Sequence, residues 1–208
     1  KKTYSYRDRR YSIMPTHNPT PFHSHLENNL LRLQALEPVD FERLYSVASD
    51  PLIWEQHPER ERYKSDIFRR FFDGALEAPM AYLIIDQATN EVIGSSRYYY
   101  LTPEEINRYK AVSPSVAHAI SIGYTFLARS HWGGKYNPAL KQLMIDHAFE
   151  TFDSVVFQVG VKNIRSRTAV ERLGAVLLPL EDELPDHAGA YDAHVIYELR
   201  KEMWGGKA

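Results

Sequence analysis

The segment from residue 119 to residue 159 constrains the fold more than any other part of the chain. A strand pattern over residues 119–127 is followed by a glycine pair, by a helix pattern that starts at Asn137 or Pro138, and by a buried-type strand over residues 155–159. Two strands joined through a helix in this way are parallel, and their connection is right-handed. The sequence therefore predicts one parallel strand pair with a helix packed on it.

Patterns outside this unit add further elements. They predict strands at 30–33, 82–85, 92–100, 176–178 and 194–199, and helices from Asp40 to Pro51, from about Ser65 to Pro79, and over 163–173 before Gly174. Pro103 and Pro114 bound a predicted loop of about 15 residues. This order of elements indicates an α/β protein with a mixed sheet and helices packed on it.

The first 26 residues differ from the rest of the chain. They show little apolar periodicity and are interrupted by Pro15, Pro19 and Pro21. We expect an extended arm over residues 1–26 that floats or docks on the body or on a second subunit, which would make a homodimer. Residues 27–208 are expected to form a single domain.

Composition excludes several classes of protein. The chain has 25 Lys and Arg against 27 Asp and Glu, a formal net charge of −2, which argues against nucleic acid as the main partner. It has no cysteine, which excludes a disulfide scaffold, a thiolate metal site and a cysteine nucleophile. Its apolar stretches are far shorter than the ~20 residues that span a bilayer, and residues 1–7 contain no apolar export signal. We expect a cytoplasmic protein without a membrane partner.

The glycine turn after the first strand of the crossover unit is a candidate anion site. Gly133 and Gly134 precede a helix with Pro138 near its first position. Free N–H groups at such a helix start bind anionic oxygens, and Arg129, Lys135 and Lys141 add positive charge. A pyrophosphate would fit, although an ordinary turn has the same pattern. The motifs G-x-x-x-x-G-K-[ST] and G-x-G-x-x-G are both absent, which disfavours a nucleotide-binding domain.

A second candidate segment opens the last long helix. Asn163 follows a buried strand, so its amide is expected at a sheet edge near the glycine turn. Read as structure alone, Asn163 is a helix N-cap and Ser166 is a first-turn residue.

Together these segments resemble the GNAT superfamily of acyl-CoA-dependent N-acyltransferases, and within it the branch of the ribosomal-protein N-terminal acetyltransferases. The resemblance covers roughly residues 30–200 and is carried by Val92-Ile93-Gly94-Ser95, Ile122-Gly123-Tyr124-Thr125, Trp132-Gly133-Gly134-Lys135-Tyr136-Asn137, the helix through Leu140, Leu143, Met144, Ala148 and Phe149, Asn163-x-x-Ser166 and Leu173-Gly174. The order and spacing of these motifs, more than any single one, make the resemblance specific.

The resemblance implies a mostly antiparallel mixed sheet in which one parallel strand pair splays to take acetyl-CoA. The backbone of Phe126 and Leu127 would pair with the pantetheine arm, and the N–H groups of Gly133, Gly134, Lys135, Tyr136 and Asn137 would hold the pyrophosphate. Asn163 and Ser166 would lie beside the arm and its sulfur, and Arg172 would lie near the phosphates. No metal is implied.

Three positions depart from the family's pattern. Lys135 stands where the second glycine of the loop is usual, so the register of the phosphate contacts is open. Val170 stands where many relatives carry a tyrosine acid, and Ser121 replaces a frequent acidic residue.

Candidates for the remaining chemistry come from polar segments around the expected cleft. Ser166 is expected to hydrogen-bond the leaving sulfur. The base is left open among Glu55, His57, His118 and a water relay, and His131 is expected to serve packing or phosphate binding. His23 and His25 with Glu27 could hold a metal, but we expect no metal site there.

The predicted function is transfer of an acetyl group from acetyl-CoA to a primary amine. A protein N-terminus, a lysine, a polyamine-like metabolite and an aminoglycoside all stay open as acceptors. The alternative is a non-catalytic module of the same fold that binds acyl-CoA or a protein partner.

Overall fold

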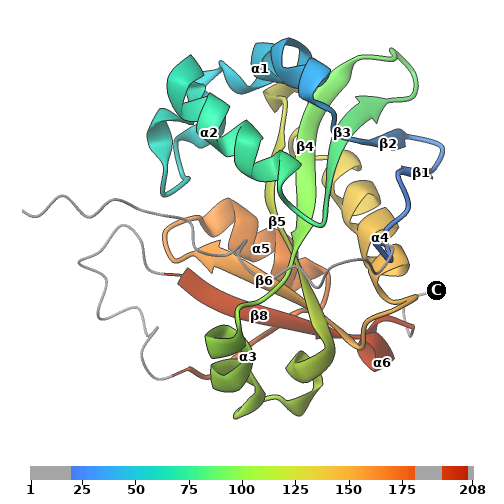
Figure 1. Ribbon diagram of the computed structural model, residues 1–208, viewed down its shortest axis with the longest axis vertical. Helices are drawn as coiled ribbons and strands as arrows, with labels where there is room; N and C mark the ends of the chain where they lie inside the picture. The colour runs from blue at the N-terminus through green and yellow to red at the C-terminus, as the bar shows by residue number, and fades with distance from the viewer. Residues whose placement is uncertain (1–19, 181–193, 206–208) are drawn as a thin grey trace, which may run out of the picture.

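The computed structural model describes residues 20–180 and 194–205. Its strands form one sheet in the order β1-β2-β3-β4-β5-β6-β8-β7, and among these described strands only β5 and β6 pair in parallel. Helices lie on both faces of the sheet (Figure 1). The predicted mixed, mostly antiparallel sheet with one parallel pair is therefore confirmed.

The boundaries follow the sequence patterns closely. The strands are β1 (His25–Glu27), β2 (Leu31–Ala35), β3 (Met80–Asp86), β4 (Val92–Tyr99), β5 (Ala119–Leu127), β6 (Ser154–Gly160), β7 (Val176–Leu177) and β8 (His194–Arg200). The helices are α1 (Phe41–Ala48), α2 (Ser65–Leu76), α3 (Pro103–Lys110), α4 (Tyr136–Ala148), α5 (Ile164–Arg172) and α6 (Lys201–Trp204), and short 3₁₀ turns include Pro51–Trp54, Pro114–His118 and Arg129–His131.

The prediction of a loop between Pro103 and Pro114 is wrong, because α3 occupies most of that stretch. The Thr102 hydroxyl accepts a hydrogen bond from the backbone N–H of Glu105, and the Glu105 side chain accepts one from the backbone N–H of Thr102. This reciprocal cap followed by Pro at the first helical position is a start signal that the sequence contains. The two prolines therefore mark helix starts and not the limits of a loop.

Residues 20–26 pack on the body of the protein, whereas residues 1–19 of the predicted arm lie outside the described residues. Phe22 is 5% exposed and its ring stacks on Tyr98 with centroids 4.3 Å apart. The carbonyl of His23 accepts a hydrogen bond from the Tyr82 hydroxyl at 2.7 Å. The short strand β1, which the sequence patterns did not indicate, then pairs with β2.

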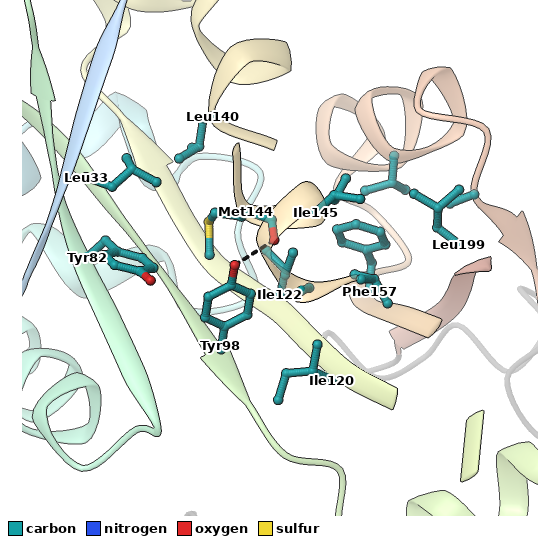
Figure 2. Close-up of a cluster of buried hydrophobic side chains, with 14 of the residues drawn as sticks. Leu33, Tyr82, Tyr98, Ile120, Ile122, Leu140, Met144, Ile145, Phe157 and Leu199 are labelled. Atoms are coloured by element: carbon teal, nitrogen blue, oxygen red, sulfur yellow. Dashed lines mark hydrogen bonds between the residues drawn. The ribbon is translucent and has the colours of Figure 1, made fainter. Parts of the chain in front are cut away.

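Two helices, α4 and α5, cover one face of the sheet over the largest core cluster. This cluster includes Leu140 and Met144 from α4 and Ile122 and Phe157 from the sheet (Figure 2). The buried Tyr98 hydroxyl donates to the carbonyl oxygen of Met144 at 2.6 Å, so the one polar atom of this ring is satisfied.

The opposite face has two separate clusters. The aromatic stripe of α2 packs with α1 over β3, and α3 covers the far end of the sheet near Val156 and Ile196. Among the described residues, no helix is both long and apolar enough to cross a membrane.

A bulge in β5 separates this strand from its parallel neighbour. Tyr124 has a φ of +54°, and the β4–β5 register slips between Ser95 and Arg97. Pairing between β5 and β6 ends at Ser121 and Val156. Because a bulge bends its strand and increases its twist, β5 diverges from β6. Among the described residues, no strand pairs with the edge of β5 beyond Ser121 on that side.

The packing of Phe22 gives a direct test of the docked segment. Replacing Phe22 with alanine removes a buried ring, and we expect the free energy of unfolding to fall by about 3 kcal/mol. Urea unfolding measures this loss, and Val39→Ala, at a side chain 79% exposed, should change the free energy by less than about 0.5 kcal/mol. Equal stability of the Phe22 variant and the wild type would show that the segment does not dock in solution.

Candidate functional site

The turn between β5 and α4 presents a run of unused backbone donors. The N–H groups of Gly133, Gly134, Lys135, Tyr136 and Asn137 donate to no acceptor among the described residues. Gly133 has a φ of +71°, and a Cβ added at Gly134 would meet nothing within 4 Å. The turn is exposed from Gly133 to Lys135. It therefore has the free amides and the open space that an anion needs at a helix start.

A buried carboxylate holds this turn in place. Asp86, at the end of β3, is 3% exposed and accepts a hydrogen bond from the Tyr136 hydroxyl at 2.9 Å. His131 Nε2 lies 3.1 Å from the same carboxylate, and its Nδ1 lies 2.8 Å from the Ser130 hydroxyl. Burial alone would raise the pKa of Asp86, but hydrogen bonds from Ala88 N–H, Tyr136 and His131 together hold this pKa below its ordinary value. His131 thus serves packing and positioning of the turn.

Of the three basic side chains expected near the turn, Lys135 and Arg129 are exposed and Lys141 is buried. Arg129 is paired with Asp50, with Nε and Oδ2 2.5 Å apart. Lys141 points inward and is 6% exposed, so the expectation that it adds positive charge at the turn is wrong. The sequence could not show this, because a lysine in a helix pattern is normally assigned to the solvated face.

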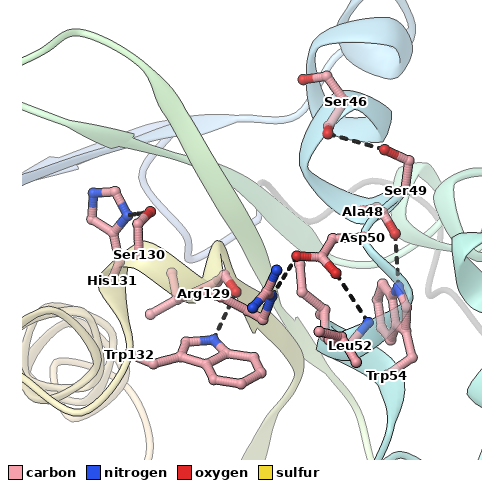
Figure 3. Close-up of polar contacts among 12 residues, drawn as sticks. Ser46, Ala48, Ser49, Asp50, Leu52, Trp54, Arg129, Ser130, His131 and Trp132 are labelled. Carbon is pink, nitrogen blue, oxygen red and sulfur yellow. Dashed lines mark hydrogen bonds and ion pairs between the residues drawn. The ribbon is translucent and has the colours of Figure 1, made fainter.

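A hollow of about 580 Å³ lies beside the turn, between the end of α1 and the residues after β5. Its lining includes Ser46, Asp50, Arg129 and Ser130. Figure 3 shows the Asp50–Arg129 ion pair beside Trp132. Residues 128–130 line the hollow and directly precede the turn, so the hollow lies next to the unused amides.

Trp132 and Arg165 connect the segments that surround the open end of the β5–β6 pair. The Trp132 indole N–H donates to the carbonyl oxygen of Leu127 at 2.9 Å. The Arg165 guanidinium lies over the Trp132 ring, 3.8 Å from its centroid, and donates to the carbonyl oxygen of Ile53 at 3.2 Å. The start of α5, the turn after β5 and the segment after α1 therefore meet at one arginine.

A second pocket, of about 100 Å³, brings three of the predicted site residues together. Glu55, His57 and Asn163 line it, along with Gly160 at the end of β6 and Lys162. The pocket therefore lies where β6 passes into α5, at the open end of the parallel pair. His57 is half-buried there, and its ring nitrogens lie 3.0 and 3.3 Å from Arg62 Nη1.

The environment of His57 keeps its imidazole neutral. Burial is the largest cause that lowers the pKa of His57 well below its ordinary value, and the positive charges of Arg62 and Arg165 together with His194 lower it further. The Nδ1 atom accepts a hydrogen bond from the Glu59 N–H at 3.2 Å. The neutral ring carries no charge at physiological pH, and the same burial and positive charges make it a weak base.

Helix α5 has the cap that its sequence predicts. The Asn163 side-chain oxygen accepts a hydrogen bond from the backbone N–H of Ser166 at 3.1 Å, and Gly174 follows the helix with a φ of +92°. Val170 is buried against the sheet. Arg172 is exposed at the far end of α5 from Asn163.

His118 is not brought to this site. It stands just before β5, at the end where β5 and β6 still pair, and its Nδ1 lies 3.1 Å from Asp153 Oδ2 at the surface. The open end of the strand pair is the opposite one. Of the four predicted catalytic residues, only Glu55 and His57 therefore line the pocket with Asn163, and Ser166 lies one turn into α5.

Sequence reasoning missed the burial of two polar groups on the face of β4 and β5 opposite α4. Arg97 is 3% exposed, its guanidinium lies 3.6 Å from the centroid of the Tyr124 ring, and its Nε and Nη1 atoms have no hydrogen-bond partner. The buried Ser121 hydroxyl also has none. The strand patterns contained these residues but gave no sign of which neighbours would surround them.

His23 lies in a group of possible metal ligands with His147 and Glu150. His147 Nε2 accepts a hydrogen bond from the backbone N–H of His23 at 3.0 Å. The proton of the neutral ring is then on Nδ1, which lies 3.2 Å from Glu150 Oε2. In this arrangement neither ring nitrogen of His147 offers a free lone pair to a metal ion.

Comparison with known proteins identifies the family to which this chain is similar. A family model described as an acetyltransferase (GNAT) domain matches residues 31–176. No curated protein matches the sequence. A solved structure of an acetyltransferase from T. thermophilus is 28% identical, with a TM-score of 0.64 over 89% of this chain and 93% of that one.

Two solved structures at lower identity share the fold. A GCN5-related N-acetyltransferase from Brucella melitensis is 16% identical, with a TM-score of 0.68 over 90% of this chain and 83% of that one. A spermidine N-acetyltransferase from Vibrio cholerae, solved with CoA and spermine, is 16% identical, with a TM-score of 0.58 over 85% of this chain and 99% of that one.

The Asp86 anchor predicts a pH-dependent change in stability. Asp86→Asn removes the charge that accepts from Tyr136 and His131, and we expect the free energy of unfolding at pH 7 to fall by about 2 kcal/mol. Because the pKa of Asp86 is lower in the folded protein, its contribution is present above the unfolded value of about 3.9 and is lost as pH falls through the folded pKa. Urea unfolding from pH 7 to pH 3 should therefore show the two proteins converging, and a constant difference would contradict this role.

Proposed function

Because the chain belongs to the GNAT acetyltransferase family, we propose that it moves an acetyl group from acetyl-CoA to a primary amine by direct transfer in a ternary complex. The observation that carries the proposal is the run of five unused N–H groups at the start of α4. These amides fit a pyrophosphate, because its oxygens would accept the hydrogen bonds that these N–H groups do not make within the described chain.

The acyl carrier is assigned to the opening between β5 and β6. The edge of β5 at Phe126 and Leu127 would pair with the pantetheine arm, as a peptide adds to a sheet edge. Asn163 and Ser166, at the start of α5, would lie beside this arm. Arg172 is the weakest of the assigned phosphate contacts, because it stands at the other end of α5. When bound, acetyl-CoA supplies an activated acyl group as a thioester.

His57 and Glu55 are assigned to the acceptor side. The attacking amine must be neutral, and α-amino groups titrate near ~8 and lysines near ~10.4, so a proton acceptor is needed. A neutral His57 in the pocket shared with Glu55 and Asn163 can take that proton directly or through water. Ser166 is assigned to hydrogen-bond the departing sulfur, and close placement of both substrates would supply much of the rate.

The acceptor is proposed to be an amine of the kinds that GNAT enzymes use, including a protein N-terminus as in the ribosomal-protein branch. The rival is a module that binds acyl-CoA without turnover, favoured by Val170 in the tyrosine slot. Release of free thiol from acetyl-CoA separates them, tested with an N-terminal peptide, free lysine, spermidine and an aminoglycoside. Thiol release with any of these amines supports the enzyme, whereas CoA binding with no release from all of them supports the module.

The phosphate assignment predicts the effect of one substitution. Gly134→Asp places a carboxylate in the open space of the turn, and we expect the Kd for CoA to rise at least ~10-fold through like charge, about 1.4 kcal/mol. Calorimetric titration measures the Kd. The melting temperature should stay within about 2 °C of wild type, because a side chain at Gly134 meets no neighbour. Gly205→Asp, also in open space, is the matched control, and equal CoA affinity of the two variants would mean that the phosphates bind elsewhere.

The base assignment predicts a change in turnover. His57→Asn should lower kcat by roughly a hundredfold while the KM for acetyl-CoA changes little. Because the pKa of His57 is lowered, activity of the wild type should decline only below about pH 6.5, the ordinary histidine value. Steady-state kinetics with Glu55→Gln in parallel identifies which residue is the base. Unchanged kcat in both variants would leave a water relay as the proton acceptor.

A further inference from the structure

Lys141 is a buried lysine whose amine has one hydrogen-bond partner among the described residues. It stands in the second turn of α4, and its Nζ donates to the Thr125 hydroxyl at 2.7 Å. The Thr125 hydroxyl lies 2.7 Å from that of Ser96. No carboxylate pairs with Lys141 among the described residues, and Thr125 is its only hydrogen-bond partner there. The charged ammonium has three N–H donors and the neutral amine has two, so at least one donor is unused in either form.

The position of this amine is tied to the splayed strands. Thr125 belongs to β5 and lies four residues beyond Ser121, where pairing with β6 ends. On the β6 side, the centroid of the Phe157 ring is 5.8 Å from Nζ. The amine therefore lies between β5 and β6 where the two strands have diverged, on the face of the sheet that α4 covers.

The charge at this position depends on burial alone. Burial lowers the pKa of Lys141 to about 7, and no charged side chain contributes to the shift. The Thr125 hydroxyl from β5 and the Phe157 ring from β6 face Nζ, and the Ser96 hydroxyl from β4 lies against Thr125. An apolar side chain of similar size would fill this site without that penalty, and an ionisable group retained at such a cost beside a proposed site is a candidate for function.

We propose that Lys141 is a binding residue for the thioester carrier, and that its Nζ hydrogen-bonds an amide carbonyl oxygen of the pantetheine arm between β5 and β6. This assignment rests on the proposed function. A carbonyl oxygen can accept an unused N–H group of Nζ, which makes no second hydrogen bond within the described chain. A carbonyl partner favours the charged amine, so binding of the arm should draw a proton from solvent at pH 7.5.

Calorimetric titration of CoA at pH 7.5, in two buffers of different ionisation enthalpy, measures this proton uptake. The wild type should take up about half a proton or more, since the free amine is mostly neutral one half-unit above its pKa. Lys141→Met should lose the uptake and raise the Kd for CoA roughly tenfold, while its melting temperature stays equal or rises. The stability readout separates a binding role from a structural one.

Lys135→Met is the matched control, because it removes a lysine from the exposed start of the same helix. It should weaken CoA binding yet keep the proton uptake of the wild type. If Lys141→Met binds CoA with wild-type affinity and uptake, the proposal is wrong. If the wild type itself does not bind CoA, the proposed function fails first.

A second measurement needs no variant. Titration of the lysine ¹³Cε signals by NMR should show one amine with a midpoint near pH 7 in the free protein, and CoA should move that midpoint upward by about one unit or more. A midpoint that stays in place at saturating CoA would overturn the assignment, even if Lys141→Met did not fold.

Discussion

The bulge at Tyr124 is the constraint on which the rest of this structure depends. Two residues of β5, Tyr124 and Thr125, lie opposite the single residue Ser96 of β4, and the φ of +54° at Tyr124 costs free energy that a glycine would not. The surroundings hold the tyrosine there, because Arg97 lies over its ring and Tyr99 packs against its edge, with centroids 5.3 Å apart. The bent strand leaves β6, and the edge that a ligand arm could use exists only because of this departure.

A second constraint fixes the turn that follows the bulge. The buried Asp86 carboxylate accepts from Tyr136 and lies against His131, so the two ends of the turn are tied to the end of β3. The amides of residues 133–137 have no partner of their own within the described chain and are held in place before any anion arrives. Such fixed donors need little rearrangement when they bind an oxyanion.

Buried polar groups have hydrogen-bond partners at one end of the parallel pair and lack some of them at the other. At the closed end, the Glu198 carboxylate is 4% exposed and accepts hydrogen bonds from the hydroxyls of Ser113, Ser115 and Ser154. Near the bulge, the guanidinium of Arg97 and the hydroxyl of Ser121 have unpaired atoms, and the amine of Lys141 has one partner. Buried polar groups are normally satisfied. Arg97 and Ser121 therefore stand out near the divergence of β5 from β6, while Arg32 Nε and His147 Nδ1 make no hydrogen bond elsewhere in the described chain.

The sequence by itself determined the elements and their order. Periodicity located the long helices and most strands, the Asn163 cap and Gly174 bounded α5, and the crossover rule gave the parallel pair. These features are local, because each depends on residues a few positions apart. Helix α3 was also readable from Thr102 and Glu105, although the two prolines by themselves favour a loop.

Only the tertiary structure decided that Lys141 points inward and that Arg165 bridges to Trp132. It also decided that His57 and Glu55 share a pocket with Asn163, and that His118 stands at the end where β5 and β6 pair. Those outcomes depend on contacts between segments far apart in the chain, and periodicity carries no information about which distant side chain will remove a given group from water.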